Sequence, residues 1–125
     1  MIHPAHPILL IDDDPKILLL QKTILNQSGI SVETASNGLE ALEKLKKSSF
    51  DAIVLDTMMP HMDGYETAKE IKKLENHKAT PIVMVTAAPE KEAMKQSFAS
   101  GVLFFMNKPF TAQKFLSVIQ TVLTK

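Results

Sequence analysis

The segment Ile8-Leu9-Leu10-Ile11-Asp12-Asp13-Asp14-Pro15 passes directly from four apolar residues to three carboxylates and a proline. The apolar run has the length of a buried strand, and Asp14-Pro15 is typical of a helix N-cap followed by the first helical residue. Two carboxylates roughly 4 Å apart repel each other by about 4 kcal/mol at an effective dielectric near 20. The acidic cluster therefore requires a bound cation, access to solvent or a protonated carboxyl group.

The length and composition of the chain predict one globular domain. Its 125 residues are 45% hydrophobic and 22% charged, which is ordinary for a protein with a single core. We predict a single domain over residues 1–125, in which residues 1–6 form a flexible N-terminal extension. The sequence contains no cysteine, no apolar run of transmembrane length and no signal peptide. These features predict a cytoplasmic protein.

The charges are balanced overall but unevenly distributed. The formal net charge is zero, and all 14 basic residues are lysines. Residues 93–125 carry four lysines and no acidic residue, so the negative charge is concentrated in the first 92 residues. A nucleic-acid-binding surface is expected to show a basic stripe with arginines that contact phosphates or bases. We therefore predict no direct binding to nucleic acid, and no membrane association.

Short apolar runs alternate with segments of helical spacing along the whole chain. The runs predict strands at residues 8–11, 31–35, 52–55, 82–85 and 103–106. A helix is predicted after each strand, with starts at Asp14, Asn37, Asp63, Pro89 and Thr111. Because the strands are too apolar to face water, they are expected to form a parallel sheet covered by helices on both faces. The predicted fold class is α/β, with a doubly wound sheet of five parallel strands.

Side chains that could bind a cation or a phosphoryl group follow four of the five predicted strands. They are Asp12, Asp13 and Asp14 after the first strand, Asp56 after the third, Thr86 after the fourth and Lys108 after the fifth. In a doubly wound sheet, binding sites form outside the carboxyl ends of the strands. Carboxylates bind Mg²⁺, while hydroxyl and ammonium groups pair with phosphoryl oxygens. The sequence therefore predicts a site for a divalent cation and a phosphoryl group, and such a cation would explain the acidic cluster.

Four motifs in this order carry a resemblance to a known family: "LLIDDDP", "IVLDTMMPHMDG", "MVTA" and "NKPF". Over about residues 7–124 the chain resembles the receiver domain of two-component response regulators. The resemblance implies a flavodoxin-like (βα)5 fold with strand order 2-1-3-4-5. It also implies that a sensor histidine kinase or a histidine phosphotransfer protein donates a phosphoryl group in a reaction that requires Mg²⁺ or Mn²⁺.

The resemblance assigns a role to each motif residue. Asp56 would be the phosphoacceptor, and Thr86 and Lys108 would bind the phosphoryl oxygens. The implied metal ligands are Asp13, Asp12 through water, Asp56 and the backbone carbonyl of Met58. Thr86 and Phe105 would form the switch that responds to phosphorylation. The domain would catalyse its own phosphorylation and autodephosphorylation without turning over a separate substrate.

The sequence also supports predictions for residues outside the phosphorylation and metal-binding roles. Met58 and Ala88 would flank the site and have no charge or amide to orient water, so hydrolysis is predicted to depend mainly on solvent access. Gly64 would allow a tight turn, and Lys108-Pro109 is a bond that the family often makes cis. Leu39, Leu42 and Leu45 are predicted to share the buried face of one helix. We interpret Met58, Met59, Met62, Met84, Met94 and Met106 as gap-fillers, and His3, His6, His61 and His77 as solvated.

The sequence departs from the family near its C-terminus. The stretch "SGVLFF" at residues 100–105 is apolar where an acid-rich turn is common, and the last helix has no arginine. These departures argue against the receiver pairing of winged-helix transcription regulators. They predict that the fourth helix, fifth strand and fifth helix form a face that binds an output domain or protein partner, through apolar side chains fringed by lysines.

Three alternatives belong to other functional classes. The chain could be a degenerate receiver that acts only as a protein-binding module, although its key side chains are all present. The segment "IDDDP" also resembles the opening of haloacid-dehalogenase-type phosphatases, which use the first aspartate as nucleophile. Those enzymes place a further acidic motif after the lysine, whereas no acidic residue follows Glu92 here. A dinucleotide-binding enzyme would need a Gly-x-Gly-x-x-Gly motif after the first strand, and it is missing.

Overall fold

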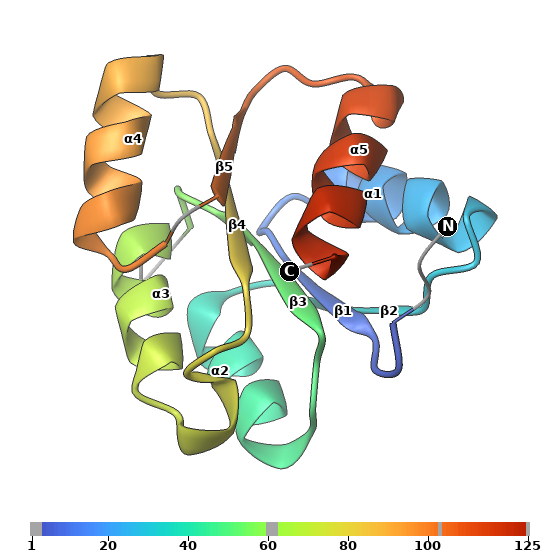
Figure 1. Cartoon of the computed structure of the whole chain (residues 1–125), viewed down its shortest axis with the longest axis horizontal. Coiled ribbons are helices and arrows are strands. Elements are labelled where there is room, and N and C mark those ends of the chain that lie inside the picture. The colour runs from blue at the N-terminus through green and yellow to red at the C-terminus, as the bar shows by residue number, and fades with distance from the viewer. Residues whose placement is uncertain (1–3, 60–62, 103, 125) are drawn as a thin grey trace.

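The computed structural model describes residues 4–59, 63–102 and 104–124. Within these residues, five parallel strands form one sheet in the order β2-β1-β3-β4-β5 (Figure 1). The strands are β1 (Ile8–Ile11), β2 (Val32–Ala35), β3 (Ala52–Asp56), β4 (Ile82–Thr86) and β5 (Phe104–Asn107). The predicted α/β class and the strand order 2-1-3-4-5 are thus confirmed. The predicted first residue of the last strand, Leu103, lies outside the described residues.

Helices cover both faces of the sheet. They are α1 (Pro15–Gln27), α2 (Gly38–Lys47), α3 (Gly64–Lys72), α4 (Glu90–Ala99) and α5 (Ala112–Leu123), and a short 3₁₀ helix, η1 (Glu75–His77), precedes β4. Figure 1 shows α1 and α5 on one face, and α2, α3 and α4 on the other. The η1 helix was not predicted from the sequence.

The alternation of side chains along each strand divides the core into two clusters. In β1, Ile8 and Leu10 pack into the cluster that contains Phe115 of α5. Leu9 and Ile11 point to the other face, into the cluster that contains Leu45 of α2. Burying one large aliphatic side chain contributes about 1.5–3 kcal/mol. A strand buried on both faces therefore anchors its carboxyl end firmly, and the candidate site lies at these carboxyl ends.

Side-chain caps fix the starts of four helices. Asp14, Asn37, Asp63 and Thr111 each accept a hydrogen bond from a backbone N–H in the first turn of α1, α2, α3 and α5, respectively. Such a cap contributes about 1 kcal/mol. The predicted starts of these helices are confirmed. The α4 helix starts after Pro89, also as predicted, without a side-chain cap.

Part of the predicted buried face of α2 was wrong. Leu39 is 62% exposed, and Leu42 is only partly buried. The residues of α2 that face the core are Gly38, Ala41 and Leu45. Leu45 is thus buried as predicted, whereas small Gly38 and Ala41 take the places expected for Leu39 and Leu42 and let the helix backbone lie close to the sheet.

The interpretation of His77 as a solvated side chain was also wrong. His77 is buried, and its Nε2 lies 3.0 Å from the backbone carbonyl oxygen of Ser48. Because a carbonyl only accepts, Nε2 donates this bond, while Nδ1 lies 2.9 Å from the Thr80 hydroxyl. The ring thus connects η1 to the residue that follows α2. His6 is exposed as predicted, and His3 and His61 lie outside the described residues.

The described methionines are of two kinds, those packed in the core and those exposed to solvent. Met84 and Met106 are buried in the core, and Met59 packs against it, as gap-fillers should. Met58 and Met94 are exposed, so the gap-filler interpretation is wrong for these two. Met62 lies outside the described residues.

Candidate functional site

Three carboxylates meet at the carboxyl edge of the sheet. Strands β1 and β3 are neighbours, with Ile11 opposite Leu55, so Asp12 and Asp56 both lie just beyond this pair. One carboxylate oxygen from each of Asp12, Asp13 and Asp56 lies within 4.8 Å of the other two. Asp12 and Asp56 are buried, whereas Asp13 is exposed. The structure therefore brings together the acidic residues that the sequence placed at separate strand ends.

The three consecutive aspartates occupy different environments. Asp12 is only 3% exposed, and its Oδ1 accepts the backbone N–H of Asp14 at 2.9 Å. Asp13 is in contact with solvent. Asp14 turns away to cap α1, where its Oδ1 accepts the backbone N–H of Lys16 at 2.9 Å. Only two of the three consecutive acids thus belong to the cluster, which relieves part of the repulsion that the sequence implied.

Lys108 supplies a positive charge to the cluster from the far edge of the sheet. It directly follows β5, and its Nζ donates a hydrogen bond of 2.7 Å to Asp56 Oδ1. Burial lowers the pKa of the Lys108 ammonium, but the hydrogen bond and charge of Asp56 together with the charges of Asp12 and Asp13 outweigh burial and raise it above its ordinary value. Lys108 therefore stays charged. The Lys108-Pro109 peptide bond is cis.

One positive charge does not balance three carboxylates. The pKa of Asp12 rises from 3.8 to about 6, mainly because the group is buried. The negative charges of Asp56 and Asp13 act in the same direction, whereas the Asp14 N–H and Lys108 oppose the rise. Without a bound cation, ionised Asp12 therefore destabilises the folded protein.

The donor set fits a small divalent cation. Carboxylate oxygens are the ligands that Mg²⁺ prefers, and the ion usually keeps several of its waters. Asp12, Asp13 and Asp56 provide converging oxygen donors, and exposed Asp13 leaves one side of the cluster open to water. A bound cation would also favour the ionised form of Asp12. The residues present therefore suit magnesium or manganese.

Thr86 lies at the end of the neighbouring strand β4 and lines a hollow. Thr86 is buried, and its Oγ1 accepts the backbone N–H of Ala88 at 3.0 Å. The hollow has a volume of about 450 Å³, and its lining includes Met58, Tyr65, Thr86, Ala87 and Ala88. Small side chains at 87 and 88 leave space in this hollow beside Thr86.

Gly64 brings α3 against the backbone of the site. Its N–H donates to the carbonyl of Thr57 at 2.9 Å. A Cβ atom at this position would lie 2.2 Å from the carbonyl oxygen of Asp56 and 2.6 Å from the Cα of Thr57. The glycine is needed for this close approach, which is a more specific role than the tight turn expected from the sequence.

Phe105 and Met58 are two further residues with predicted roles. Phe105 lies in β5, is partly buried and packs against the cluster formed with α2 and α3. Met58, two residues after Asp56, is 77% exposed. The switch role of Phe105 and the metal-ligand role of the Met58 carbonyl stay predictions.

Sequence reasoning gave no role to Asn107, the first residue of "NKPF". Its Nδ2 donates to the backbone carbonyl of Ala88 at 2.9 Å. The signal available in the sequence was its place beside Lys108, at the end of a strand where polar side chains collect. The partner of the amide is 19 residues away and becomes visible only in the folded chain.

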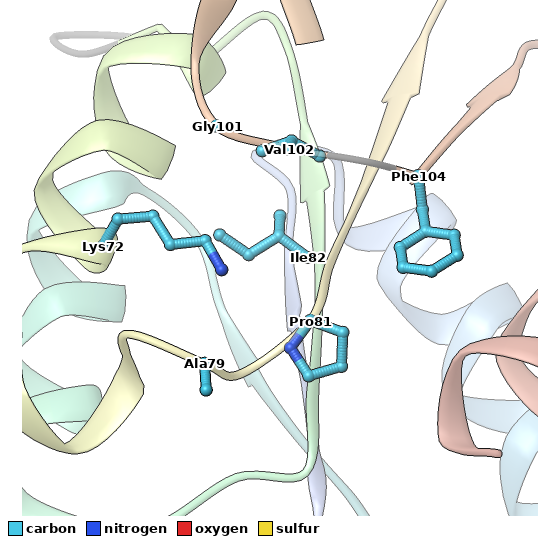
Figure 2. A pocket seen from close by; sticks show the side chains of 7 residues that line it. All are labelled: Lys72, Ala79, Pro81, Ile82, Gly101, Val102 and Phe104. Atoms are coloured by element: carbon cyan, nitrogen blue, oxygen red, sulfur yellow. The ribbon is translucent and has the colours of Figure 1, made fainter. Parts of the chain in front are cut away.

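A second pocket lies at the opposite, amino-terminal end of β4 and β5. It has a volume of about 530 Å³ and is lined mainly by apolar residues around Ile82, Val102 and Phe104 (Figure 2). Figure 2 shows the Lys72 side chain extending towards Ile82, and its Nζ donates to the carbonyl of Thr80 at 2.9 Å. Burial lowers the pKa of Lys72. The described residues of the lining include no carboxylate, so they lack the chemistry of the acidic cluster.

The chain matches the family described as "Response regulator receiver domain" over residues 8–120. It is 39% identical over 118 residues to the transcriptional regulatory protein CpxR homolog of Haemophilus influenzae, covering 94% of this chain and 50% of that protein. It is 35% identical over 121 residues to the transcriptional regulatory protein SrrA of Staphylococcus aureus, covering 97% of this chain and 49% of that protein. The chain thus spans about half the length of these curated relatives.

Solved structures of chemotaxis and kinase receivers have the same fold. The chemotaxis protein CheY4 of Vibrio cholerae aligns with a TM-score of 0.90 at 35% identity, over 96% of this chain and 100% of that one. The receiver domain of the sensor histidine kinase PA1611 from Pseudomonas aeruginosa aligns with a TM-score of 0.88 at 25% identity, over 98% of this chain and 100% of that one. That structure holds a magnesium ion in its active site cleft. From its sequence match, its fold and its relatives, this chain belongs to the family of two-component response regulator receiver domains.

Proposed function

We propose that this receiver accepts a phosphoryl group on Asp56 in a magnesium-dependent reaction. The observation that carries the proposal is the 2.7 Å bond between Lys108 Nζ and Asp56 Oδ1, with Asp56 a member of the Asp12, Asp13 and Asp56 cluster. A buried carboxylate with one paired oxygen, beside converging acids and a hollow, suits attack on a phosphoryl group. The donor would be a sensor histidine kinase or a histidine phosphotransfer protein.

The residues of the site would act mainly by position and charge. A carboxylate oxygen of Asp56 attacks phosphorus, and the bond from phosphorus to the donor breaks. Lys108 then pairs with phosphoryl oxygens, and the Thr86 hydroxyl donates to another. A metal ion held by Asp12, Asp13, Asp56 and the Met58 backbone carbonyl would supply the positive charge that the three acids lack. The domain would catalyse only its own phosphorylation and dephosphorylation.

Phosphorylation would be communicated through Thr86 and Phe105. Thr86 would move towards the new oxygens, and Phe105 would turn inwards into the space that Thr86 leaves. The face built by α4, β5 and α5 would then bind an output domain or protein partner. Met94 and Phe98 are exposed one turn apart on α4, and Phe104 and Phe105 are only partly buried. This exposed apolar surface, with Lys95 on α4 and Lys114 on α5, supports a protein partner.

We also propose a cytoplasmic location without membrane or nucleic-acid contacts of this domain. Among the described residues, no helix is both long and apolar enough to cross a membrane. The flexible extension at residues 1–6 stays a prediction: residues 1–3 lie outside the described residues, and the His6 N–H donates to Asp51 Oδ2 at 3.1 Å.

Intact mass after incubation with a small-molecule phosphodonor tests the proposed function. The wild type is expected to gain one phosphoryl group when Mg²⁺ is present and none when a chelator replaces it. Asp56→Asn is expected to gain none, because an amide is not a nucleophile towards phosphorus. Asp51→Asn is the matched control, since Asp51 directly precedes the amino-terminal end of the same strand, and it should react like the wild type.

Two other outcomes would favour the alternative functions. A wild type that never gains the adduct would point to a degenerate receiver that only binds proteins. An adduct that persists in Asp56→Asn would move the nucleophile to Asp12 and support the phosphatase alternative.

Met58→Asn is expected to accelerate loss of the phosphoryl group by about threefold to tenfold. The wild-type side chain is exposed beside the hollow but cannot hold water by a hydrogen bond. An amide there could orient the attacking water, and positioning of this kind changes rates by about one order of magnitude or more. The decay of the adduct with time measures the rate, and Met94→Asn, another exposed methionine, is the control. An unchanged rate in Met58→Asn would show that this position does not limit hydrolysis.

A further inference from the structure

The backbone of Ala88 is held by hydrogen bonds at both of its polar groups. Its N–H donates to Thr86 Oγ1 at 3.0 Å, and its carbonyl accepts from Asn107 Nδ2 at 2.9 Å. Asn107 lies opposite Thr86 in the register between β4 and β5. The next residue, Lys108, donates its backbone N–H to the carbonyl of Thr86 at 2.8 Å. The end of β5 thus fastens both Thr86 and the loop that follows it.

The loop from β4 to α4 depends on such outside support. It consists of Ala87, Ala88 and Pro89, none of which has a side chain that forms hydrogen bonds. Pro89 also has no backbone N–H, and α4 begins after it without a side-chain cap. Partners that fix the orientation of these peptide groups must therefore come from other segments, and the Asn107 amide is one of them.

We propose that Asn107 is a positioning residue for Thr86. By fixing the Ala88 carbonyl, Asn107 keeps the Ala88 N–H directed at Thr86 Oγ1. The hydroxyl oxygen then accepts a hydrogen bond, and its proton remains available for an oxygen of the incoming phosphoryl group. This inference rests on the proposed function, because it assigns Asn107 to the same phosphorylation site.

The rate of phosphorylation by a small-molecule donor in Mg²⁺ tests this role. Asn107→Ala is expected to react about fivefold more slowly than the wild type, which corresponds to about one neutral hydrogen bond. Asn76→Ala is the matched control, because the Asn76 Nδ2 also donates to a backbone carbonyl, that of Leu45, at 3.0 Å. Asn76 lies in η1, away from the site, so its variant should lose a similar bond and keep the wild-type rate.

A double-mutant cycle separates positioning of Thr86 from an effect on Lys108. In a Thr86→Val background, Asn107→Ala is expected to have no further effect on the rate, because the hydroxyl that it positions is gone. A fivefold effect that persists in this background would assign the action of Asn107 to Lys108 and overturn the proposal. Equal rates for Asn107→Ala and wild type would overturn it as well, as would an equal slowing by Asn76→Ala.

Hydrogen exchange of the Ala88 amide gives a readout that needs no phosphorylation. In Asn107→Ala this N–H is expected to exchange with solvent severalfold faster than in the wild type, while the amides of α5 keep their rates. Unchanged exchange at Ala88 would show that Asn107 does not hold the loop. If the wild type takes up no phosphoryl group but Ala88 exchange responds, the proposed function fails while the positioning of Ala88 stands.

Discussion

Gly64→Ala is expected to lower the free energy of unfolding by about 3 kcal/mol, which is large for the addition of one methyl group. The new Cβ would lie 2.2 Å from the carbonyl oxygen of Asp56 and 2.6 Å from the Cα of Thr57. Both are backbone atoms of a buried strand end, so neither can move aside as a flexible side chain would. Relief requires α3 or the end of β3 to shift, and Asp56 moves with β3. The variant should therefore also react more slowly with a phosphodonor.

Urea unfolding of Gly64→Ala and Gly101→Ala checks the cause of this loss. Gly101 has a φ of +81°, and a Cβ added there would meet no heavy atom of the described residues within 4 Å, so alanine adds conformational strain without a clash among them. That strain costs about 1–2 kcal/mol. Gly64→Ala should be clearly less stable than Gly101→Ala, and only Gly64→Ala should slow phosphorylation. A Gly64→Ala protein as stable as Gly101→Ala would mean that α3 moves away easily.

The sequence predicted the sheet and the gathering of site residues because both follow from local patterns. Strands of a doubly wound sheet are buried on both faces, so they appear as unbroken apolar runs such as Ile8–Ile11. Their carboxyl ends share one edge, which places Asp12, Asp56 and Lys108 together. The strand order came from the family resemblance, since alternation alone does not specify which strands are neighbours.

The wrong predictions for Leu39 and His77 concern residues whose burial depends on how the folded segments pack. Leu39 was assigned to the core because leucine is apolar, but small Gly38 and Ala41 allow α2 to approach the sheet instead. His77 can be buried at low cost because the carbonyl of Ser48, 29 residues earlier, accepts its Nε2 hydrogen bond. Asn107 has the same kind of partner in Ala88. Side-chain bonds to distant backbone groups leave no periodic signal in the sequence.

Asp12→Asn is expected to stabilise the magnesium-free protein by about 2 kcal/mol at pH 7.5. Asp12 is buried beside Asp56, and its pKa rises to about 6, so at pH 7.5 the folded protein holds a charge that burial disfavours. Asparagine removes this charge, and its Oδ1 can still accept the Asp14 N–H. The increase in the free energy of unfolding comes from removing the buried charge and requires no new contact. Urea unfolding with a chelator present measures this increase.

The gain from Asp12→Asn should depend on pH in a defined direction. Well below pH 3.8, Asp12 is protonated in both the folded and the unfolded wild type, and its titration contributes nothing. Between pH 3.8 and about 6 the unfolded chain releases the proton while the folded protein keeps it, so wild-type stability falls relative to the variant. The difference should then stay constant above about pH 6. A gain that is equally large at pH 3.5 would assign it to packing rather than to charge.

Magnesium should reverse the order of stability of these proteins. The wild type is expected to gain stability with increasing Mg²⁺ as the folded state binds the ion, whereas Asp12→Asn should gain much less. Asp13→Asn is the control, because it removes an exposed member of the same acidic cluster. It should also weaken the response to Mg²⁺ but should not stabilise the protein in chelator to the same extent. If both variants were stabilised equally without metal, the net charge of the cluster rather than the burial of Asp12 would set the energy of the site.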